Sequence, residues 1–500
     1  MASNLDHIPL GPMDHMPPPT PQPGIIYFRI QPGITNEQVF EHLKEGLYQT
    51  FLQTPWLNGK IYAQSPDAPG WRPGQLEIRF NPNVGDTGMP KCYQLRYNEL
   101  EPSLSLDDLE MSGFPVDSFD DEQLTWVSYK PQGTNFNEGF EVVAAQANFI
   151  PGACLLVPSV HHAACDAIGM GVFLKLWGDQ CRILSLRSQG SSDSVALLPP
   201  ETWDRALPAR ICRKEATGHS VADVSPDTWQ LIGLDPPGPQ ADGLRPAKRV
   251  KVPPRAQTMS SRIYYMPATA FKDLQHEGKK RLEAPDVSGN DIILALLWRT
   301  LMRARVAARA GGHDAASKMA DLDSQVELQT VCDARPDFSH HLPSSYIGNC
   351  VFYHRTKVPL RALIELGSPL SFVAHSIRLN ARNINHEQIM DAYMLVDSMP
   401  DWTLLQPLRH MSVEDTWMMS SMIMIPEDAT CFGDSIFANG GHPVGFRMLM
   451  GSRNRSQVPA CYVMPRKKHG GLELVLSVFE DEWEFVDKDE EFGRYTMHMA

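Results

Sequence analysis

The sequence lacks the patterns that mark several large classes of protein. Its nine cysteines are scattered singly through 500 residues with no Cys-x-x-Cys pair, which argues for reduced thiols in a cytosolic setting. No apolar run reaches the roughly 18 residues that a membrane-spanning helix requires. The first residues are polar and proline-rich, without the basic and apolar regions of a secretory leader. We therefore expect a soluble, cytoplasmic protein with no membrane partner.

Basic charge is also scarce. The chain has 45 lysines and arginines against 59 aspartates and glutamates, which gives a net charge of −14. The basic cluster between Arg245 and Arg255 is interrupted by prolines and is typical of a solvated linker. Because phosphate binding needs a basic surface, nucleic acid is not expected as a main partner.

Three active-site motifs are missing as well. No Gly-x-Ser-x-Gly elbow occurs, which leaves a serine hydrolase without support. Neither a Gly-x-Gly-x-x-Gly turn nor a phosphate-binding loop is present, so redox chemistry with a nucleotide cofactor is unsupported.

The composition that remains is that of an ordinary globular protein, with 42% hydrophobic and 21% charged residues. Prolines crowd residues 1–24, which predicts an extended N-terminal arm without helix. Strand and helix patterns then alternate, so we expect a mixed α and β fold. Residues 188–258 lose this periodicity and are rich in Pro, Gly and Ser, which indicates a long linker between two domains at 25–187 and 259–500.

Individual elements can be predicted where the pattern is strong. Ser288 and Asp291 fit a capping box that opens an apolar helix. Residues 149–160 and 472–479 are apolar and β-branched, as in buried strands. The acidic segment 480–491 has no metal-ligand spacing and is predicted to be a solvated helix or turn.

The chemistry is expected where one of these strands ends, at His161-His162. Asp166 and Gly169 follow, and although His-x-x-x-Asp alone is a weak signal, a buried strand that ends in two histidines beside a glycine turn would leave an imidazole at the mouth of a sheet. Histidine titrates near neutral pH. It therefore suits a general base that takes a proton from a hydroxyl while a thiolate, already a good leaving group, departs from a thioester.

Other interpretations of the same residues remain open at this point. A purely structural histidine is as compatible with the local sequence as a catalytic one. His161, His162 and Asp166 could ligate a metal, but no third or fourth ligand stands at a recognisable spacing, so no metal is expected. Cys165 is interpreted as a small buried residue rather than a nucleophile, because no cysteine-protease signature surrounds it.

Beyond this motif, the chain resembles a known family over most of its length. The segments that carry the resemblance occur in this order: Leu155 to His162 with Asp166 and Gly169; Asn290-Asp291 followed by Leu296-Leu297-Trp298-Arg299; Cys332-Asp333-Ala334-Arg335 followed by Tyr346-Ile347-Gly348-Asn349; and Tyr462-Val463-Met464-Pro465-Arg466. Taken together they are similar to the BAHD acyltransferases, especially the fungal branch that includes the trichothecene O-acetyltransferases.

The resemblance implies an α/β (α+β) fold of two similar chloramphenicol-acetyltransferase-like domains, each a mixed β-sheet flanked by helices, joined by a long crossover loop. Donor and acceptor would enter a tunnel between the domains from opposite faces. His162 would be the general base, and Asp166 would support the motif through an ion pair. The resemblance further implies a monomer with no permanently bound cofactor, which uses acetyl-CoA or another acyl-CoA as co-substrate.

The second motif of the family, Asp-Phe-Gly-Trp-Gly, is degenerate here. Its nearest match begins at Cys431 and reaches Asp434, so a cysteine stands in place of the aspartate, and the tryptophan is missing. Asp434 is close enough to substitute for that aspartate. Arg447 and Arg453, further along the chain, are the candidates for contacts with CoA phosphates. The glycines of this region fit a flexible loop equally well.

Three functional hypotheses follow. The first is an acyl-CoA-dependent O-acyltransferase that acetylates a hydroxyl of a fungal secondary metabolite, a small-molecule alcohol acceptor. The second keeps the fold but takes the acyl group from the acyl carrier protein of a polyketide synthase. The third is a family relative that binds or cyclises a metabolite without acyl transfer.

Overall fold

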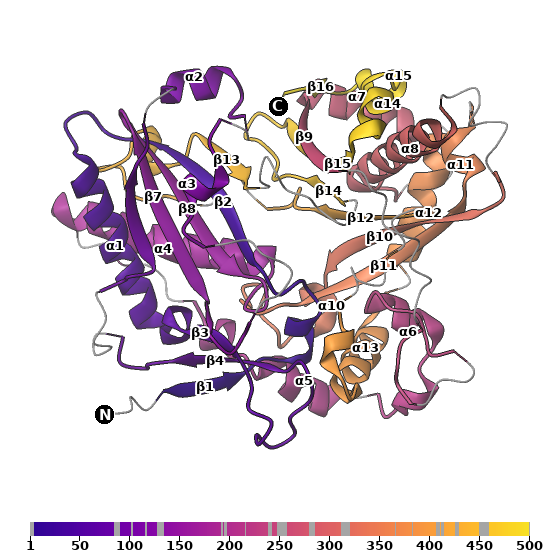
Figure 1. Cartoon of the computed structure of the whole chain (residues 1–500), viewed down its shortest axis with the longest axis horizontal. Coiled ribbons are helices and arrows are strands. Elements are labelled where there is room, and N and C mark those ends of the chain that lie inside the picture. The colour runs from indigo at the N-terminus through magenta and orange to yellow at the C-terminus, as the bar shows by residue number, and fades with distance from the viewer. Residues whose placement is uncertain are drawn as a thin grey trace.

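A computed structural model gives the arrangement of the chain in space (Figure 1). It describes residues 5–84, 91–101, 104–115, 118–127, 135–191, 194, 198–215, 217–238, 243–247, 258–279, 286–311, 321–365, 367–382, 384–406, 411, 415–425, 430–449 and 460–499. Two large β-sheets with their helices form the two halves of the molecule, and a small sheet lies at the edge of the first half.

The first half is built on a five-stranded sheet. Its strands, in spatial order, are β13 (Gly445–Met448), β2 (Pro21–Arg29), β8 (Ala153–His161), β7 (Val143–Ile150) and β5 (Leu95–Glu99). Alternate residues of β2 and β8 face opposite sides, and both sides are apolar. One side is covered by α1 (Asn36–Gln53) and α4 (Ala167–Ser188), the other by α2 (Leu106–Met111) and α3 (Asp121–Leu124).

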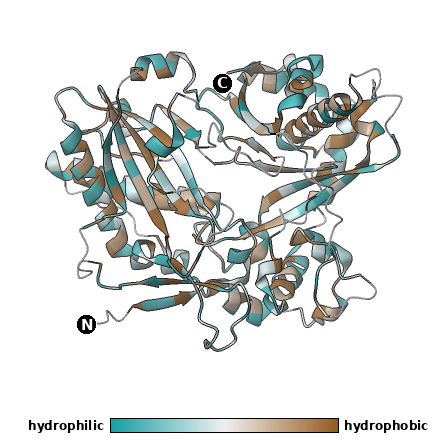
Figure 2. Cartoon of the chain, in the orientation of Figure 1, coloured by the Kyte–Doolittle hydropathy of each residue, from teal (hydrophilic) through white to brown (hydrophobic). Residues whose placement is uncertain are grey.

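The second half is built on a seven-stranded mixed sheet. Its strands, in spatial order, are β11 (Val351–Pro359), β10 (Gln325–Asp333), β12 (Thr416–Ser421), β14 (Ala460–Val463), β15 (Leu472–Phe479), β9 (Met259–Met266) and β16 (Met497–His498). The helices packed on its outer face are α7 (Ala268–Lys279), α8 (Gly289–Ala310), α11 (Arg361–Ile364), α12 (Leu370–Arg382), α14 (Trp483–Asp487) and α15 (Glu490–Gly493). Apolar stretches follow the central strands and α8 (Figure 2). Within the described part of the chain, none of the helices combines the length and apolarity that crossing a membrane requires.

One strand of the first sheet comes from the C-terminal half of the chain. β13 comes from the C-terminal part of the chain but pairs with β2, so that Arg447 lies opposite Ile25. Just before it, Phe432 and Phe437 enter the core of the first half and pack around Phe28. The domain ranges 25–187 and 259–500 stay a prediction. In the structure, β13 from the later range forms part of the sheet of the earlier one.

The N-terminal arm and the linker are both structured where they are described. In the arm, β1 (Asp6–Pro9) is followed by the 3-10 helix η1 (Pro12–His15), which the prediction of a helix-free arm missed because proline is tolerated in a first helical turn. β1 joins the small sheet with β4 (Leu76–Phe80), β3 (Lys60–Ala63) and β6 (Phe140–Glu141). In the linker, η3 (Pro200–Thr202), α5 (Leu207–Glu215), η4 (Val221–Asp223) and α6 (Pro226–Leu231) form short helices, and α5, η4 and α6 pack against α13 (His386–Ser398).

Most of the predicted elements are confirmed, with two corrections. α8 begins at the Ser288 capping box and β15 covers Leu472–Phe479, both as expected. The segment 149–160 is not one strand, because Gly152, with a φ of 74°, turns the chain between β7 and β8. The acidic segment is helical but only partly solvated, since Glu482 is fully buried in an ion pair with Arg305.

Candidate active site

The His-x-x-x-Asp motif forms the loop between β8 and α4. β8 ends at His161, and Asp166 caps the first turn of α4 by accepting a hydrogen bond from the Gly169 amide at 2.9 Å. Gly169 is required because a Cβ there would lie 2.1 Å from the Ile347 carbonyl oxygen, which belongs to the other half of the molecule. The loop is therefore placed where the two halves touch.

His162 is fixed by three hydrogen bonds. Its backbone amide donates to the Thr20 carbonyl at 2.9 Å, and its own carbonyl accepts from Asn349 Nδ2 at 2.8 Å. Its ring Nδ1 lies 3.1 Å from the Cys165 carbonyl oxygen. Because a carbonyl can only accept, Nδ1 carries the proton in this arrangement and Nε2 keeps its lone pair. Burial lowers the pKa of His162, so the ring is neutral and able to accept a proton near pH 7.

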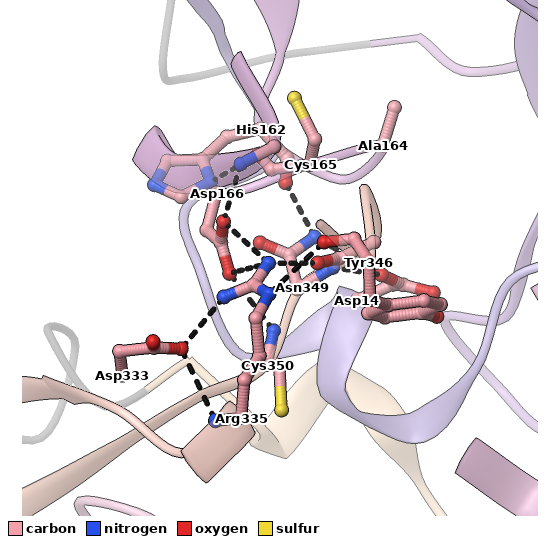
Figure 3. A network of polar contacts seen from close by, with 12 residues as sticks. Asp14, His162, Ala164, Cys165, Asp166, Asp333, Arg335, Tyr346, Asn349 and Cys350 are labelled. Carbon is pink, nitrogen blue, oxygen red and sulfur yellow. Dashed lines mark hydrogen bonds and ion pairs between the residues drawn. The ribbon is translucent and has the colours of Figure 1, made fainter. Parts of the chain in front are cut away.

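Asp166 is saturated by contacts that hold the loop (Figure 3). Besides the Gly169 amide, its carboxylate accepts from the Cys350 amide at 2.9 Å and from Arg335 Nη2, which lies 2.9 Å from both carboxylate oxygens. Both members of this ion pair are buried, with 4% and 2% of Asp166 and Arg335 exposed. Asp166 therefore joins the two halves beneath the motif through its ion pair with Arg335, and its supporting role in the reaction stays a prediction.

Arg335 contributes to the site, although no role was predicted for it from the sequence. It stands at the start of α10 (Arg335–Phe338) and also donates to the Tyr346 carbonyl at 3.0 Å, the Gly348 carbonyl at 2.8 Å and Asp333 at 2.7 Å. Its place in the Cys-Asp-Ala-Arg segment could have drawn attention to Arg335. Its ion pair with Asp166, 169 residues away, cannot be inferred from sequence spacing. Asn349 was missed in the same way, although it follows Tyr346 in the next quoted segment.

The neighbours of His162 within the motif face elsewhere. His161 is buried, its Nδ1 accepts a hydrogen bond from the Ala163 amide at 3.2 Å, and its ring packs against Phe136 and Phe140. Burial, aided by His162, lowers the pKa of His161 to about 3. Burial raises the pKa of the Cys165 thiol, so this cysteine stays protonated and is the small buried residue that the sequence predicted.

The degenerate second motif is fastened to the end of α4. Asp434 accepts hydrogen bonds from Ser185 Oγ at 3.0 Å and from Gln189 Nε2 at 3.2 Å. Gly433, with a φ of 100°, turns the loop next to Cys431. Asp434 thus anchors the loop, and its predicted substitution for the family aspartate stays a prediction.

Of the two candidate CoA residues, the structure describes only Arg447. Arg447 is 2% exposed, forms an ion pair with Glu473 of β15 and donates to the Phe114 carbonyl at 3.0 Å. It bridges the sheets beside a pocket that lies between β13 and the second sheet. The pocket is lined by Ser261, Ile263, Arg447, Met448, Met464, Glu473 and Val475. Arg453 lies outside the described residues. The phosphate contacts stay a prediction.

The described residues contain no group of three or more His, Cys, Asp or Glu side chains arranged to hold a metal ion. His162 lies where the two halves meet, and burial lowers the pKa of its ring.

Comparison with known proteins places this site in a family. A model described as the Transferase family matches residues 106–492, and one described as the trichothecene 3-O-acetyltransferase-like N-terminal domain matches residues 25–181. The chain belongs to this Transferase family, and with O-acetyltransferases among its relatives it is an acyltransferase. The resemblance to the BAHD acyltransferases is thus confirmed.

Individual relatives agree with this assignment. The chain is 29% identical to the isocyanide synthase-NRPS hybrid crmA of Aspergillus fumigatus over 94% of its own length, but it spans only 30% of that relative. It is 23% identical to the eremophilane O-acetyltransferase prx11 of Penicillium rubens, with 92% of each chain covered. The crystal structure of TRI101 of F. graminearum with coenzyme A and deoxynivalenol matches 99% of this chain and 100% of its own, with a TM-score of 0.73 and 16% identity. That likeness confirms the two-domain fold.

Proposed function

We propose that the protein is an acyl-CoA-dependent O-acyltransferase in which His162 is the general base. The observation that carries the proposal is the hydrogen bond from His162 Nδ1 to the Cys165 carbonyl, because it fixes the tautomer that leaves Nε2 basic. Burial keeps the ring neutral near pH 7, which is the state that a base must have.

In the proposed reaction the acyl group passes directly from donor to acceptor. His162 Nε2 takes the hydroxyl proton as the acceptor oxygen forms its bond to the thioester carbonyl carbon. The tetrahedral oxyanion then collapses, the carbon–sulfur bond breaks, and the imidazolium returns its proton to the departing thiolate. Cys165, the nearest thiol in the motif, is buried and protonated, so no acyl-enzyme intermediate is required.

The substrates are proposed from the relatives. TRI101 binds coenzyme A and the toxin deoxynivalenol in its crystal structure, and prx11 is an eremophilane O-acetyltransferase. We therefore propose acetyl-CoA as the donor and a hydroxyl of a fungal secondary metabolite as the acceptor.

The nine cysteines are free, which supports a reducing, cytoplasmic compartment. The monomeric state stays a prediction.

A second donor is favoured by one observation. The relative crmA is an isocyanide synthase-NRPS hybrid, and this chain corresponds to 30% of it. A thioester held on a carrier domain would meet the same imidazole and react in the same way.

Thermal unfolding of the purified protein with coenzyme A, acetyl-CoA and longer acyl-CoAs tests the donor without knowledge of the acceptor. A ligand at a hundred times its Kd adds about 2.7 kcal/mol to the free energy of unfolding, which raises Tm measurably. The thioester that gives the largest rise is then supplied with a panel of alcohols, and release of the thiol is followed with a dye. No rise with any of them would favour the carrier-bound donor, and no thiol release from either kind of thioester would contradict acyl transfer.

A further inference from the structure

The part of the N-terminal arm that forms η1 is buried beneath the motif loop. Asp14, in η1, is 4% exposed, and its Oδ2 accepts a hydrogen bond from the Gly11 amide at 2.8 Å. The next residue, His15, holds the arm in place: its Nδ1 donates to the Gly11 carbonyl at 2.8 Å and its Nε2 accepts from the Leu76 amide at 3.0 Å. The arm therefore places a carboxylate at a defined point between the two halves.

One oxygen of that carboxylate reaches the motif loop through the linker. Asp14 Oδ2 lies 2.8 Å from Arg205 Nη2, and both side chains are almost fully buried, with 5% and 3% exposed. The other terminal nitrogen, Arg205 Nη1, donates to the carbonyl of Ala164, two residues after His162. Asp14 thus neutralises the buried charge that holds this carbonyl.

The second oxygen reaches the same loop through the second half. Asp14 Oδ1 accepts from Asn349 Nδ2 at 3.0 Å and from the Asn349 backbone amide at 3.3 Å. The same Nδ2 donates to the His162 carbonyl at 2.8 Å. Figure 3 shows Asp14 and Asn349 on one side of the loop and Arg335 beneath it. Asp14 is thus the common partner of two side chains that hold the carbonyls of residues 162 and 164.

We propose that Asp14 is a positioning residue for His162, an inference that rests on the proposed function of that histidine. The imidazole is oriented by the bond from Nδ1 to the Cys165 carbonyl, and that carbonyl follows directly after the one that Arg205 holds. Loss of the Asp14 charge would leave Arg205 buried without this counter-ion. It would also weaken the hold of Arg205 and Asn349 on the carbonyls of residues 164 and 162. Small displacements of a catalytic group cost rate even when the fold persists.

The test compares Asp14→Asn with Asp204→Asn. Asp204 is the matched control, because it is the neighbour of Arg205 and pairs with Arg210 on the surface, where 32% of its side chain is exposed. For Asp14→Asn we expect kcat to fall about 10- to 100-fold while KM for the thioester changes by less than about threefold. In spectra of protein labelled with ¹⁵N-histidine, the signal of His162, assigned by its absence in His162→Ala, should show a second tautomer. Asp204→Asn should match the wild type in both measurements.

A merely structural ion pair would lower Tm but leave the tautomer and the kcat of the folded enzyme unchanged. If Asp14→Asn does not fold, Asp14→Glu retains the charge that Arg205 requires but displaces the carboxylate, and the same loss of kcat and mixed tautomer are expected. A folded Asp14 variant with wild-type kcat and a single tautomer would overturn the proposal. His162→Ala separates the two claims: if it retains turnover, the proposed function fails; if it is inactive while the Asp14 variants match the wild type, only the positioning role fails.

Discussion

The chemistry of His162 depends on which ring nitrogen carries the proton. A carbonyl, not a carboxylate, accepts the hydrogen bond from Nδ1, since Asp166 is occupied by Arg335 and two backbone amides. The loop therefore fixes the tautomer through backbone geometry, while the aspartate of the motif holds the loop itself. The histidine and the aspartate of this short motif therefore have different roles.

The pH dependence of turnover follows from the lowered pKa of His162. The ring must be neutral to act as a base, and burial moves its pKa below the ordinary value of 6.5. We expect kcat/KM to fall on the acidic side of an apparent pKa below 6.5 and to be flat from there to about pH 8. This fall on the acidic side is checked by measuring the rate of thiol release across the pH range, on protein shown to be folded at each pH. An activity that rises only above about pH 8 would contradict the assignment.

Replacement of Asp166 should act mainly on stability. Asp166→Asn removes one of the two carboxylates that pair with the buried Arg335 and leaves Asp333 at 2.7 Å. We expect the free energy of unfolding, measured by urea unfolding, to fall by about 3 kcal/mol and the rate to fall with it. Asp179→Asn is the matched control on the same helix, because Asp179 pairs with Lys175 at the surface and should change stability by less than about 1 kcal/mol. A fully stable but inactive Asp166→Asn enzyme would instead indicate a direct chemical role.

At the scale of elements, the strand–loop–helix unit of β8 and α4 carries the site. Its contact with the other half is close at Gly169, where the missing side chain admits the Ile347 carbonyl. The unit cannot be moved away from the second half without loss of the Asp166–Arg335 pair. The geometry of the base is thus tied to the packing of the two domains.

A pair of glycine substitutions on α4 tests this contact. Gly169→Ala should reduce both stability and turnover, because its Cβ would overlap the Ile347 carbonyl oxygen at 2.1 Å. Gly171→Ala lies two residues along the same helix with nothing within 4 Å, and it should stabilise the protein by up to about 1 kcal/mol. Tm and thiol release are measured for both. Equal behaviour of the two variants would show that the close approach does not matter.

The elements also show which parts of the fold could be predicted from the sequence. α8 and β15 follow from local patterns, because a capping box and an apolar run are read within one element. The turn at Gly152 was missed because two adjacent buried strands give one continuous apolar segment. The position of His162 at a strand end was predictable for the same local reason, and its role came from the family resemblance.

At the scale of the molecule, the site is assembled from the arm, the linker and both halves. Asp14, Arg205, Arg335 and Asn349 converge on the motif loop from segments far apart in the sequence. No spacing rule connects them, which is why the sequence predicted the motif but not its supports. The place of β13 in the first sheet was missed for the same reason, since strand pairing over 400 residues leaves no local trace.

The whole molecule should lose stability as the pH falls, because several described histidines are buried and neutral. Burial lowers the pKa of His15 and His354 to about 4 and that of His161 to about 3. Unfolded histidines bind protons near pH 6.5, whereas these folded ones do not, so protons favour the unfolded state below that pH. Each such group removes up to about 3 kcal/mol as the pH approaches 4.

We therefore expect Tm to decrease steadily from about pH 7 to about pH 5. Replacement of His354 by Gln should make this decrease shallower, because one group that takes up a proton on unfolding is removed. A Tm that is constant or rises over the same interval would contradict the buried, neutral state of these rings.

Turnover of His162→Ala decides whether His162 accepts the proton of the acceptor hydroxyl. With the best thioester and acceptor from the screen, we expect kcat to fall at least about 10²-fold while Tm and the binding of coenzyme A stay close to wild type. His276→Ala, an exposed histidine on α7, is the control and should retain full activity. Retention of wild-type turnover by a folded His162→Ala enzyme would contradict the role of His162 as the general base.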